Sequence, residues 1–545
     1  MTFQPERSRL LLAAPLLLLI LLCGWLSLLH AGRIPFMGKD EPKNAEALRE
    51  MAERGDWVTT TLQGEPWFDK PILYYWVSLI FFHLLGPGEA AARLAPALFG
   101  AAGVLLTYGL ARLLFDARIA MRAGVILATS LEYFWFSRTA VVDLPLTFCV
   151  ALSLAAFYRA LEGPGNALWW HRIGFAAAGG AVLAKGPVGI VLPGLVVGAY
   201  LIASRRLAEL KRVPWISGTL LFLLVSGPWY LTVSLRHGQR FWDDFIINRN
   251  VNRYLTTVHH HPGPVYYYLP VLIIGLFPWG AILPFAVGRI FGAGWRDLTG
   301  ARRKFGFLLL WVLMPLLFFS LAGSKLPSYL LPCFPALAIL AAWGWGAVVE
   351  EKEGRPSAVR RWAVAFLLLL FPILAAGIHF WCRSEAPDQI PAQLPLTVML
   401  AATAAALGLA AALGKFRLLF PVCAAGAVLS LTTLVVFSLG NVREQASLTR
   451  ISAEAVRLSR EGNVVVAYRN FHNSLYFYTE NRVPWVKERP GLDGLLRERR
   501  MLYCLLEGRG LKELEGDPSV RLEVLDRQHK VTLARVTLLP GGQDG

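Results

Sequence analysis

Thirteen apolar segments long enough to cross a membrane dominate the sequence. A helix needs about 20 apolar residues to span the roughly 30 Å hydrocarbon core of a bilayer. The segments are residues 10–29, 92–115, 118–136, 143–161, 170–184, 187–204, 214–235, 264–288, 305–322, 327–349, 361–382, 395–413 and 416–438. The chain is 55% hydrophobic and 17% charged, whereas soluble domains carry about 25% charged residues. We therefore predict a polytopic α-helical membrane protein.

Two apolar stretches have a second interpretation. Residues 10–29 could be a secretory signal, but the apolar core of a signal has about 7–15 residues, and this run is longer. We therefore expect an uncleaved first span. A fourteenth stretch, 72–86, has only about fifteen residues, which is short for a span. It could instead be a helix that lies along the membrane surface.

Basic loops decide whether 72–86 crosses the membrane. If it does not cross, every loop on the cytoplasmic side contains Lys or Arg, as the positive-inside rule requires; if it does, the bias points the wrong way. The basic residues are Arg112, Arg118, Arg159, Arg172, Arg205, Arg206, Lys211, Arg212, Arg289, Arg296, Arg302, Arg303, Lys304, Lys352, Arg355, Arg360, Arg361, Lys415 and Arg417. We therefore predict thirteen spans, with the N-terminus in the cytoplasm and the C-terminus outside. The net charge of +17 then reflects topology and does not indicate nucleic acid.

The end of the chain differs in composition from the rest. Residues 441–545 are polar and lack a long apolar run. Segments 463–468, 501–506 and 531–538 read as strands, and 448–460 reads as an amphipathic helix. We predict a transmembrane domain over 1–440, which includes an outer juxtamembrane loop at 31–91, and a small periplasmic α/β domain over 441–545. The six cysteines include no CxxC pair, which excludes a disulfide scaffold or a zinc module.

The first outer loop carries acidic residues ahead of a predicted amphipathic helix. Residues 38–57 read GKDEPKNAEALREMAERGDW. The apolar stripe of this helix consists of Ala45, Leu48, Met51 and Ala52. Asp40 stands where a helix cap would stand, so it is either only a cap or a functional carboxylate. Further on, Asp69 and Lys70 lie among aromatic residues, which fits either a site or an interfacial belt with a snorkelling lysine.

Ten polar residues share the outer side in this topology. They are Asp40, Glu41, Asp69, Lys70, Asp143, Lys185, Arg253, His261, Lys325 and Tyr329. A carboxylate at the edge of a span, such as Asp143, is costly unless it faces a cavity or a partner. Lys185 could merely snorkel, and the run His259–His261 could be a solvated loop. Together, carboxylates and cations beside the bilayer suit a substrate with an anionic head and a lipid tail.

The motifs resemble those of the bacterial branch of the protein O-mannosyltransferase superfamily, which has the GT-C fold. The resemblance is closest to the aminoarabinose lipid A transferase (ArnT) group and covers essentially the whole chain. The matching stretches are Asp40-Glu41-Pro42, GDW at 55–57, FDKP at 68–71, Asp143, AKG at 184–186, YYYLP at 266–270 after His261, and MPLLFFSLAGSKLPSYLL at 314–331.

The resemblance implies inverting transfer of a sugar from a polyprenyl-phosphate donor to an acceptor on the periplasmic side of the bacterial inner membrane. Asp40 would be the central acidic residue, with Glu41 beside it, and Asp143 would be the second carboxylate. The donor phosphate and lipid would be held by Lys43, Lys70, Lys185, Arg253 and Tyr329. In this group, positions matching Asp69 and His261 can share a structural metal ion such as zinc. No other cofactor is expected.

The sequence departs from the family pattern at the sugar–phosphate site. Lys43 and Asn44 stand where the family usually has Arg-Tyr, and Trp67-Phe68-Asp69 stands where it usually has Tyr-Phe-Glu. Lys keeps the charge of Arg but loses its planar fork, which grips phosphate through two bonds. The departures concern which sugar is carried and leave the reaction class unchanged.

The resemblance favours 4-amino-4-deoxy-L-arabinose as the sugar, undecaprenyl phosphate as its carrier and lipid A phosphate as the acceptor. Three alternatives remain open. The enzyme could transfer a hexose such as mannose to another envelope glycan or to protein. A transporter is a different class, but its coupling sites would place charges in mid-span, where this chain has almost none, and no repeat is visible. A flippase would bind lipid-linked sugar without chemistry.

Overall fold

The computed structural model describes residues 5–256, 263–292, 299–349, 358–385, 389–439, 448–469 and 472–539. The chain divides into two compact units. We call the first the helical unit; it consists of residues 1–31, 68–81 and 93–438. The second, the α/β unit, consists of residues 32–67, 82–92 and 439–545. The division between residues 438 and 439 falls close to residue 440, where we predicted a boundary. Two segments of the predicted outer loop, 32–67 and 82–92, belong to the second unit.

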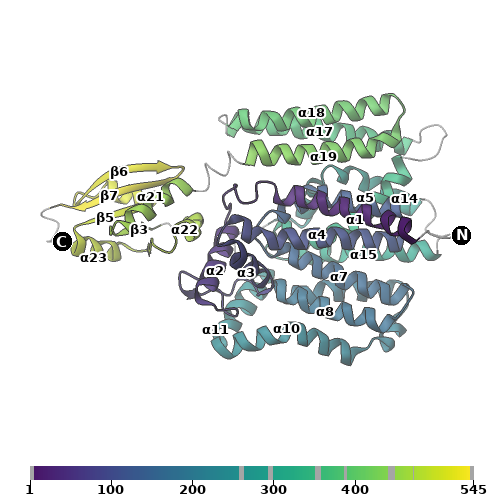
Figure 1. Cartoon of the computed structure of the whole chain (residues 1–545), viewed down its shortest axis with the longest axis horizontal. Helices are drawn as coiled ribbons and strands as arrows, with labels where there is room; N and C mark the ends of the chain where they lie inside the picture. Colours follow the sequence, from purple (N-terminus) through teal and green to yellow (C-terminus); the bar gives the residue numbers. More distant parts are fainter. Residues whose placement is uncertain are drawn as a thin grey trace. The chain divides into compact units, whose positions relative to one another are not determined.

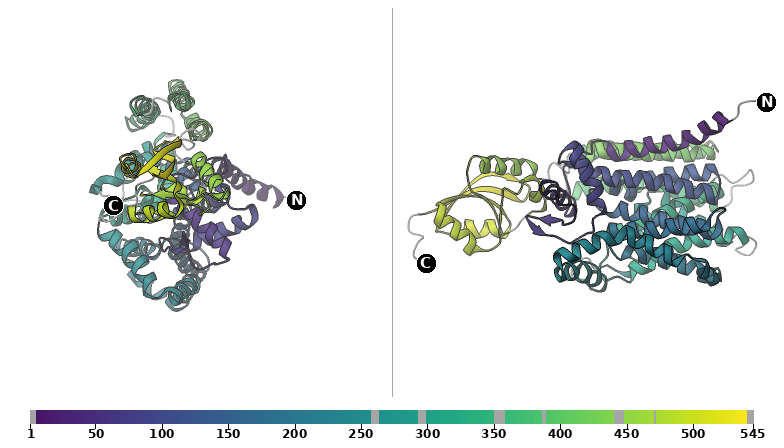
Figure 2. Two further views of the ribbon diagram at one scale, coloured as in Figure 1. Left: turned by 90° about the vertical axis from the view of Figure 1, so that its left-hand side faces the viewer. Right: turned by 60° about the horizontal axis from the view of Figure 1, so that its bottom comes forward.

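Long helices that run side by side build the helical unit (Figures 1 and 2). They are α1 (Pro5–Leu28), α3 (Leu73–Leu85), α4 (Glu89–Leu114), α5 (Ala117–Thr129), α6 (Leu131–Ser137), α7 (Asp143–Glu162), α8 (Ala167–Lys185), α9 (Val188–Ala203), α10 (Trp215–His237), α13 (Tyr268–Gly275), α14 (Leu283–Gly292), α15 (Thr299–Ser320), α16 (Phe334–Gly344), α17 (Ala358–Glu385), α18 (Ile390–Ala412) and α19 (Leu419–Thr433). Short segments join them: η1 (Leu207–Arg212), α11 (Gln239–Phe241), η2 (Trp242–Asn252), α12 (Arg253–Leu255), η3 (Val265–Tyr267), η4 (Trp279–Ile282), η5 (Pro327–Cys333), η6 (Trp345–Val349), η8 (Phe416–Leu418) and η9 (Leu434–Leu439).

The helices give the chain a multi-pass membrane fold. In the described part of the chain, eight helices are long and apolar enough to cross a membrane, or ten if each of two bent pairs is one span. The bent pairs are α5 with α6, at 64°, and 265–275 with 279–291, at 112°. Every predicted segment is helical, but 118–136 and 264–288 correspond to the bent pairs, and 14–28 and 188–203 are shorter apolar helices. The count of thirteen, and the surface position of 72–86, therefore remain predictions.

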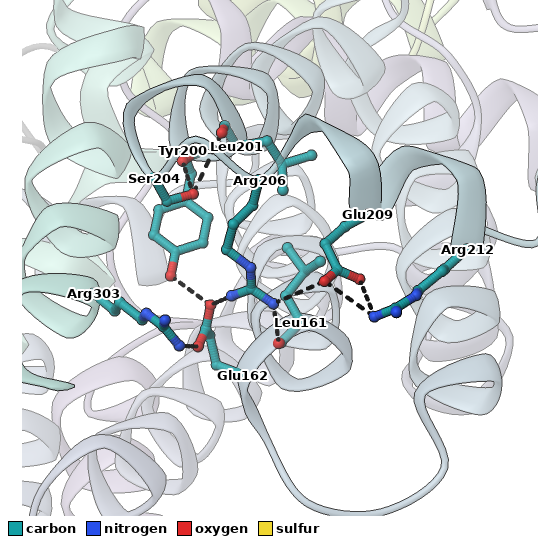
Figure 3. A network of polar contacts seen from close by, with 9 residues as sticks. All are labelled: Leu161, Glu162, Tyr200, Leu201, Ser204, Arg206, Glu209, Arg212 and Arg303. Carbon is teal, nitrogen blue, oxygen red and sulfur yellow. Dashed lines mark hydrogen bonds and ion pairs between the residues drawn. The ribbon is translucent and has the colours of Figure 1, made fainter. Parts of the chain in front are cut away.

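A network of ion pairs joins the ends of α7, α9 and α15 (Figure 3). Glu162, the last residue of α7, accepts hydrogen bonds from the Tyr200 hydroxyl at 2.8 Å and from Arg303 at 3.3 Å, and it also pairs with Arg206. Arg206 in turn contacts Glu209, which pairs with Arg212 at 3.2 Å. The side chain of Glu162 is only 10% exposed. One carboxylate therefore pairs with two arginines, one in α15 and one in the turn after α9.

We expect Glu162→Gln to lower the stability of the protein in detergent by about 2 kcal/mol, between the typical values for buried and exposed ion pairs. Gln keeps the size of Glu162 but removes the carboxylate that pairs with Arg206 and Arg303, which leaves Arg206 paired with Glu209 alone in this network. The apparent unfolding temperature measures the effect. Arg212→Ala is the control, because that side chain is 78% exposed and its loss should change the temperature little.

The C-terminal part of the α/β unit is a five-stranded sheet with helices on both faces (Figure 1). The strand order is β4 (Trp485–Val486), β3 (Val465–Tyr468), β5 (Met501–Glu507), β7 (Val531–Leu538) and β6 (Val520–Gln528). The first three strands are parallel, and β7 is antiparallel to its two neighbours. The helices are α21 (Thr449–Arg460), α22 (Asn473–Tyr478), α23 (Arg489–Arg499) and α24 (Arg509–Glu515). The predicted helix at 448–460 and the three predicted strands are confirmed.

Alternation along the strands builds two apolar layers, because successive side chains of a strand point to opposite faces. On β3, Val465 and Ala467 pack in the layer that contains α21 and α22. Val466 and Tyr468 pack in the layer that contains α23 and α24. The sheet is therefore covered on both faces.

The first outer loop folds as part of this unit. It contains α2 (Asp40–Arg54) and a hairpin of β1 (Thr61–Leu62) and β2 (Glu65–Pro66). Glu50 of α2 accepts hydrogen bonds from the Thr61 hydroxyl, from the backbone N–H of Gln63 at 2.6 Å and of Gly64 at 3.2 Å, and from the Asn481 amide at 3.1 Å. Burial alone would raise the pKa of Glu50, but these bonds hold it below its ordinary value. One carboxylate thus fixes helix, hairpin and C-terminal domain together.

Candidate functional site

Asp143 and Lys185 meet at the ends of two neighbouring helices. Asp143 is the first residue of α7 and Lys185 the last residue of α8. The next residue, Gly186, has φ 82°, a conformation that suits glycine and turns the chain sharply into α9. A Cβ on Gly189 would clash with the backbone of Ala181, so α9 packs closely against α8. This tight turn holds Lys185 Nζ 2.5 Å from Asp143 Oδ1.

Asp69 anchors a second group of charges. Its carboxylate lies 2.8 Å from Lys70 Nζ and 3.1 Å from a guanidinium nitrogen of Arg249. Burial would raise the pKa of Asp69, but the charges of Lys70 and Arg249, with Arg253 beyond them, hold it well below its usual range. Asp69 is therefore an ionised carboxylate that orients cations.

Both groups open into one cavity of about 330 Å³. Its charged lining residues are Asp69, Lys70, Lys185, Arg249 and Arg253. With Asp143 included, four cations stand against two carboxylates, which leaves an excess of two positive charges. Most of the remaining lining is apolar and includes Val188, Val191, Leu255, Phe318 and Phe319. The cavity is thus suited to an anionic group attached to an apolar chain.

Arg253 supplies an unused hydrogen-bond donor in this cavity. Its Nε is buried and has no partner among the residues that the structure describes. Another part of the Arg253 guanidinium forms a hydrogen bond with the Tyr329 hydroxyl. The Tyr329 ring also faces Lys185, whose Nζ is 5.1 Å from the ring centroid. A buried donor without a partner is costly, and a phosphate oxygen would satisfy it.

The predicted site residues fall into two groups. The helical unit brings together residues from five separate sequence segments: Asp69, Lys70, Asp143, Lys185, Arg253 and Tyr329. Lys325 was also predicted on the outer side, but its ammonium donates to the carbonyl of Ala322 at 2.7 Å and is buried. It is not among the cavity-lining residues that the structure describes.

Asp40, Glu41 and Lys43 belong to the α/β unit. Asp40 is exposed and begins α2, while the capping position before the helix is Lys39, which makes no side-chain cap. Glu41 is 1% exposed and accepts a hydrogen bond from the backbone N–H of Met37 at 2.9 Å. The ammonium of Lys43 lies 5.6 Å from the ring centroid of Tyr476. The predicted pairing of Asp40 with Asp143 remains a prediction.

The predicted metal site also remains a prediction. His261 lies outside the described residues, as do His259 and His260. Asp69, the other predicted ligand, is paired with Lys70 and Arg249. Within the described ranges, no group of three His, Cys, Asp or Glu side chains is placed to hold a metal ion. The donor set seen here fits a carboxylate that orients cations and does not by itself make a metal centre.

Arg249 is a cavity residue that the sequence analysis missed. Its signal was present in the stretch NRNVNRY, where Arg249 and Arg253 are four residues apart and thus share one face of a helical turn. The structure forms a helical segment there, η2 followed by α12, and both arginines line the cavity.

A protein-family model matches a segment that contains part of the candidate site. Residues 69–231 match the model of the family described as dolichyl-phosphate-mannose-protein mannosyltransferase. Among solved structures, the crystal structure of ArnT from Cupriavidus metallidurans bound to undecaprenyl phosphate superposes with a TM-score of 0.79 at 25% identity. That similarity covers 95% of this chain and 97% of that one.

Two curated relatives carry the name undecaprenyl phosphate-alpha-4-amino-4-deoxy-L-arabinose arabinosyl transferase. The protein of Pectobacterium atrosepticum is 36% identical over 57% of this chain and 56% of its own length. The protein of Aeromonas hydrophila is 32% identical over 65% of this chain and 64% of its own length. The chain thus matches less than two thirds of each relative in sequence, whereas the structural similarity is nearly complete. This chain has the GT-C fold and is similar to the ArnT-type aminoarabinose transferases, and its residues 69–231 match the mannosyltransferase family model.

Proposed function

We propose that the protein is an inverting membrane glycosyltransferase that transfers 4-amino-4-deoxy-L-arabinose from undecaprenyl phosphate to a phosphate of lipid A. The observation that carries this proposal is the cavity of the helical unit, which combines an excess of two positive charges with an apolar wall. The names of the relatives and the undecaprenyl phosphate in the similar ArnT structure support the same donor.

The donor phosphate would lie among Lys70, Lys185, Arg249 and Arg253, with its polyprenyl chain along the apolar wall near Val191 and Phe318. Charge-assisted hydrogen bonds from Lys and Arg are the strongest contacts available to a phosphate. In the transfer, an acceptor phosphate oxygen bonds to the anomeric carbon as the bond from that carbon to the donor phosphate breaks. The leaving phosphate gains negative charge, which the four cations stabilise more strongly in the transition state than in the bound donor.

Carboxylates have a separate role in this proposal. An acceptor that is already an ionised phosphate needs no strong general base. Asp143, held by Lys185, and Asp40 would instead orient the reactants and balance the positive charge that develops on the sugar ring. The ammonium group of the aminosugar would also find favourable partners in these carboxylates.

The test of sugar and acceptor is mass spectrometry of lipid A and of other envelope glycans, with and without the gene, in a bacterial host that lacks its own transferase. A gain of one aminopentose on a lipid A phosphate supports the proposal. A hexose on another glycan or on protein would replace the aminoarabinose assignment. If no glycan changes while lipid-linked sugar moves between leaflets, the protein is a flippase.

The proposed location is the bacterial inner membrane, with the N-terminus in the cytoplasm and the α/β domain in the periplasm. We expect Glu53→Cys, Asn248→Cys and Glu488→Cys to react with an impermeant thiol reagent in intact spheroplasts. Ala208→Cys in η1, predicted to be cytoplasmic, should react only after lysis. The background is low because the six native cysteines are buried. Labelling at 53 and 248 without labelling at 488 would contradict the odd number of spans.

A further inference from the structure

A second hollow of the helical unit contains a carboxyl group that the proposed reaction does not use. It is a groove of about 710 Å³ between α6 and the segment formed by η3 and α13. Its walls are almost entirely apolar and include Trp135, Tyr267 and Ile274. Ile274 is 59% exposed, so the groove is open along one side. Among these walls, Glu132 is the acidic residue.

Glu132 is buried without a partner. Only 8% of the residue is exposed, and its Oε1 has no hydrogen-bond partner within the described part of the chain. It lies one residue beyond Leu131, where α6 begins after the 64° bend that separates it from α5. Across the groove, a Cβ on Gly275 would clash with the carboxylate, so the glycine makes room for it. A polar group buried among apolar side chains is costly unless it finds a hydrogen-bond partner.

The groove lies next to the cavity. Pro327, at the start of η5, lines the groove, and Tyr329, two residues later, lines the cavity. Glu132 is also within electrostatic range of Asp143. A ligand in the groove and a donor lipid in the cavity would therefore both contact η5. An acceptor lipid needs such a position, with its tail in an apolar groove and its head near the carboxylates.

We propose that this groove binds an acyl chain of the acceptor lipid, and that Glu132 forms a hydrogen bond with a hydroxyl or amide N–H on that chain. The inference rests on the proposed function, because it takes the cavity as the donor site. A polyprenyl chain does not suit the groove, since it carries no hydrogen-bonding group and would leave Glu132 unsatisfied. A hydroxylated or amide-linked acyl chain provides apolar surface that packs against the walls of the groove. It also provides the hydrogen-bond donor that Glu132 lacks.

The kinetic test separates the two lipid substrates of the full-length enzyme in nanodiscs. Ile274→Trp fills the open side of the groove and should raise the KM for lipid A roughly tenfold or more, with the KM for the donor unchanged. Ile273→Trp is the matched control, because Ile273 is also exposed, at 46%, but is not among the groove residues. Glu132→Leu should raise the acceptor KM about tenfold, whereas Glu132→Gln, which still hydrogen-bonds, should stay within about threefold of wild type.

Direct binding makes the test independent of catalysis. Native mass spectrometry of the purified protein with added lipid A should show binding that Ile274→Trp weakens and Ile273→Trp does not. If wild type binds lipid A in this way but transfers no sugar, the proposed function fails while the groove assignment stands. A rise in the donor KM instead would assign the groove to the polyprenyl chain and overturn the inference. It is also overturned if neither KM nor binding responds to Ile274→Trp, or if wild type shows neither transfer to lipid A nor binding of it.

Discussion

Asp40→Asn is expected to lose on the order of a hundredfold or more in sugar-transfer turnover while the protein stays folded in the membrane. Asn keeps the size of Asp and most of its ability to cap a helix, but it carries no negative charge. Asp40 is exposed at the start of α2, where it is not packed in a core. A large loss of turnover would therefore report a role of the charge in the reaction. Transfer from purified donor lipid in detergent measures it.

Two neighbours on the same helix are the controls for Asp40. Glu53→Gln also removes one negative charge from α2 at a side chain that is 60% exposed, and it should leave turnover unchanged. Glu41→Gln should instead lower the apparent unfolding temperature, because Glu41 is buried and bonded to the backbone of Met37. Near wild-type transfer by Asp40→Asn would remove Asp40 from the active site.

The helical architecture was predictable because apolar length is a local property. Each of the thirteen segments is helical, two of them as bent pairs, and the stretch 72–86 forms the short helix α3. The breaks inside helices were not predictable in the same way. The bend between α5 and α6 falls at Ser130, and residues 125–136 contain no proline or glycine that would mark it. Tertiary packing decides such a bend.

Some strands were likewise predictable from the sequence and others were not. Segments 501–506 and 531–538 are apolar enough to be recognised, and both lie inside the sheet. The edge strand β6 was missed because charged residues alternate with apolar ones in VRLEVLDRQ. That pattern is typical of a strand with one exposed face, but it resembles a polar loop when only apolar runs are sought. The two-residue strand β4 is too short to leave a signal.

Several residues of the cavity were predictable as members of one site, but their pairs were not. Asp143 and Lys185 are 42 residues apart, and only the α7–α8 hairpin brings them together. Arg249 pairs with Asp69 across 180 residues of sequence, which no periodicity reveals. Glu132 was missed because it stands alone within an aromatic run. Pairing of this kind depends on packing between helices, which a single sequence does not encode locally.

Lys185→Ala is expected to lower kcat/KM for the donor roughly tenfold to a hundredfold, since removing one charge-assisted contact typically costs about 1.5–3 kcal/mol. We expect the upper end of that range. Lys185 lines the cavity, pairs with Asp143 at 2.5 Å and faces the Tyr329 ring, so its removal loses a phosphate contact and also releases a carboxylate. Lys70→Ala should show the lower end, because Arg249 still pairs with Asp69 in its absence.

A double-mutant cycle between Lys185→Ala and Asp143→Asn separates these two contributions. If Lys185 acts only by orienting Asp143, the double variant should be no worse than the more damaged single variant. If Lys185 also binds the donor phosphate, the double variant should lose further activity, and the extra loss should appear in the donor KM. Thermal unfolding of each variant controls for damage to the α7–α8 turn. Unchanged donor kinetics in both Lys185→Ala and Lys70→Ala would exclude these lysines from the phosphate site. Removing a cation that contacts the donor phosphate in a cavity of this size must weaken the binding of that phosphate.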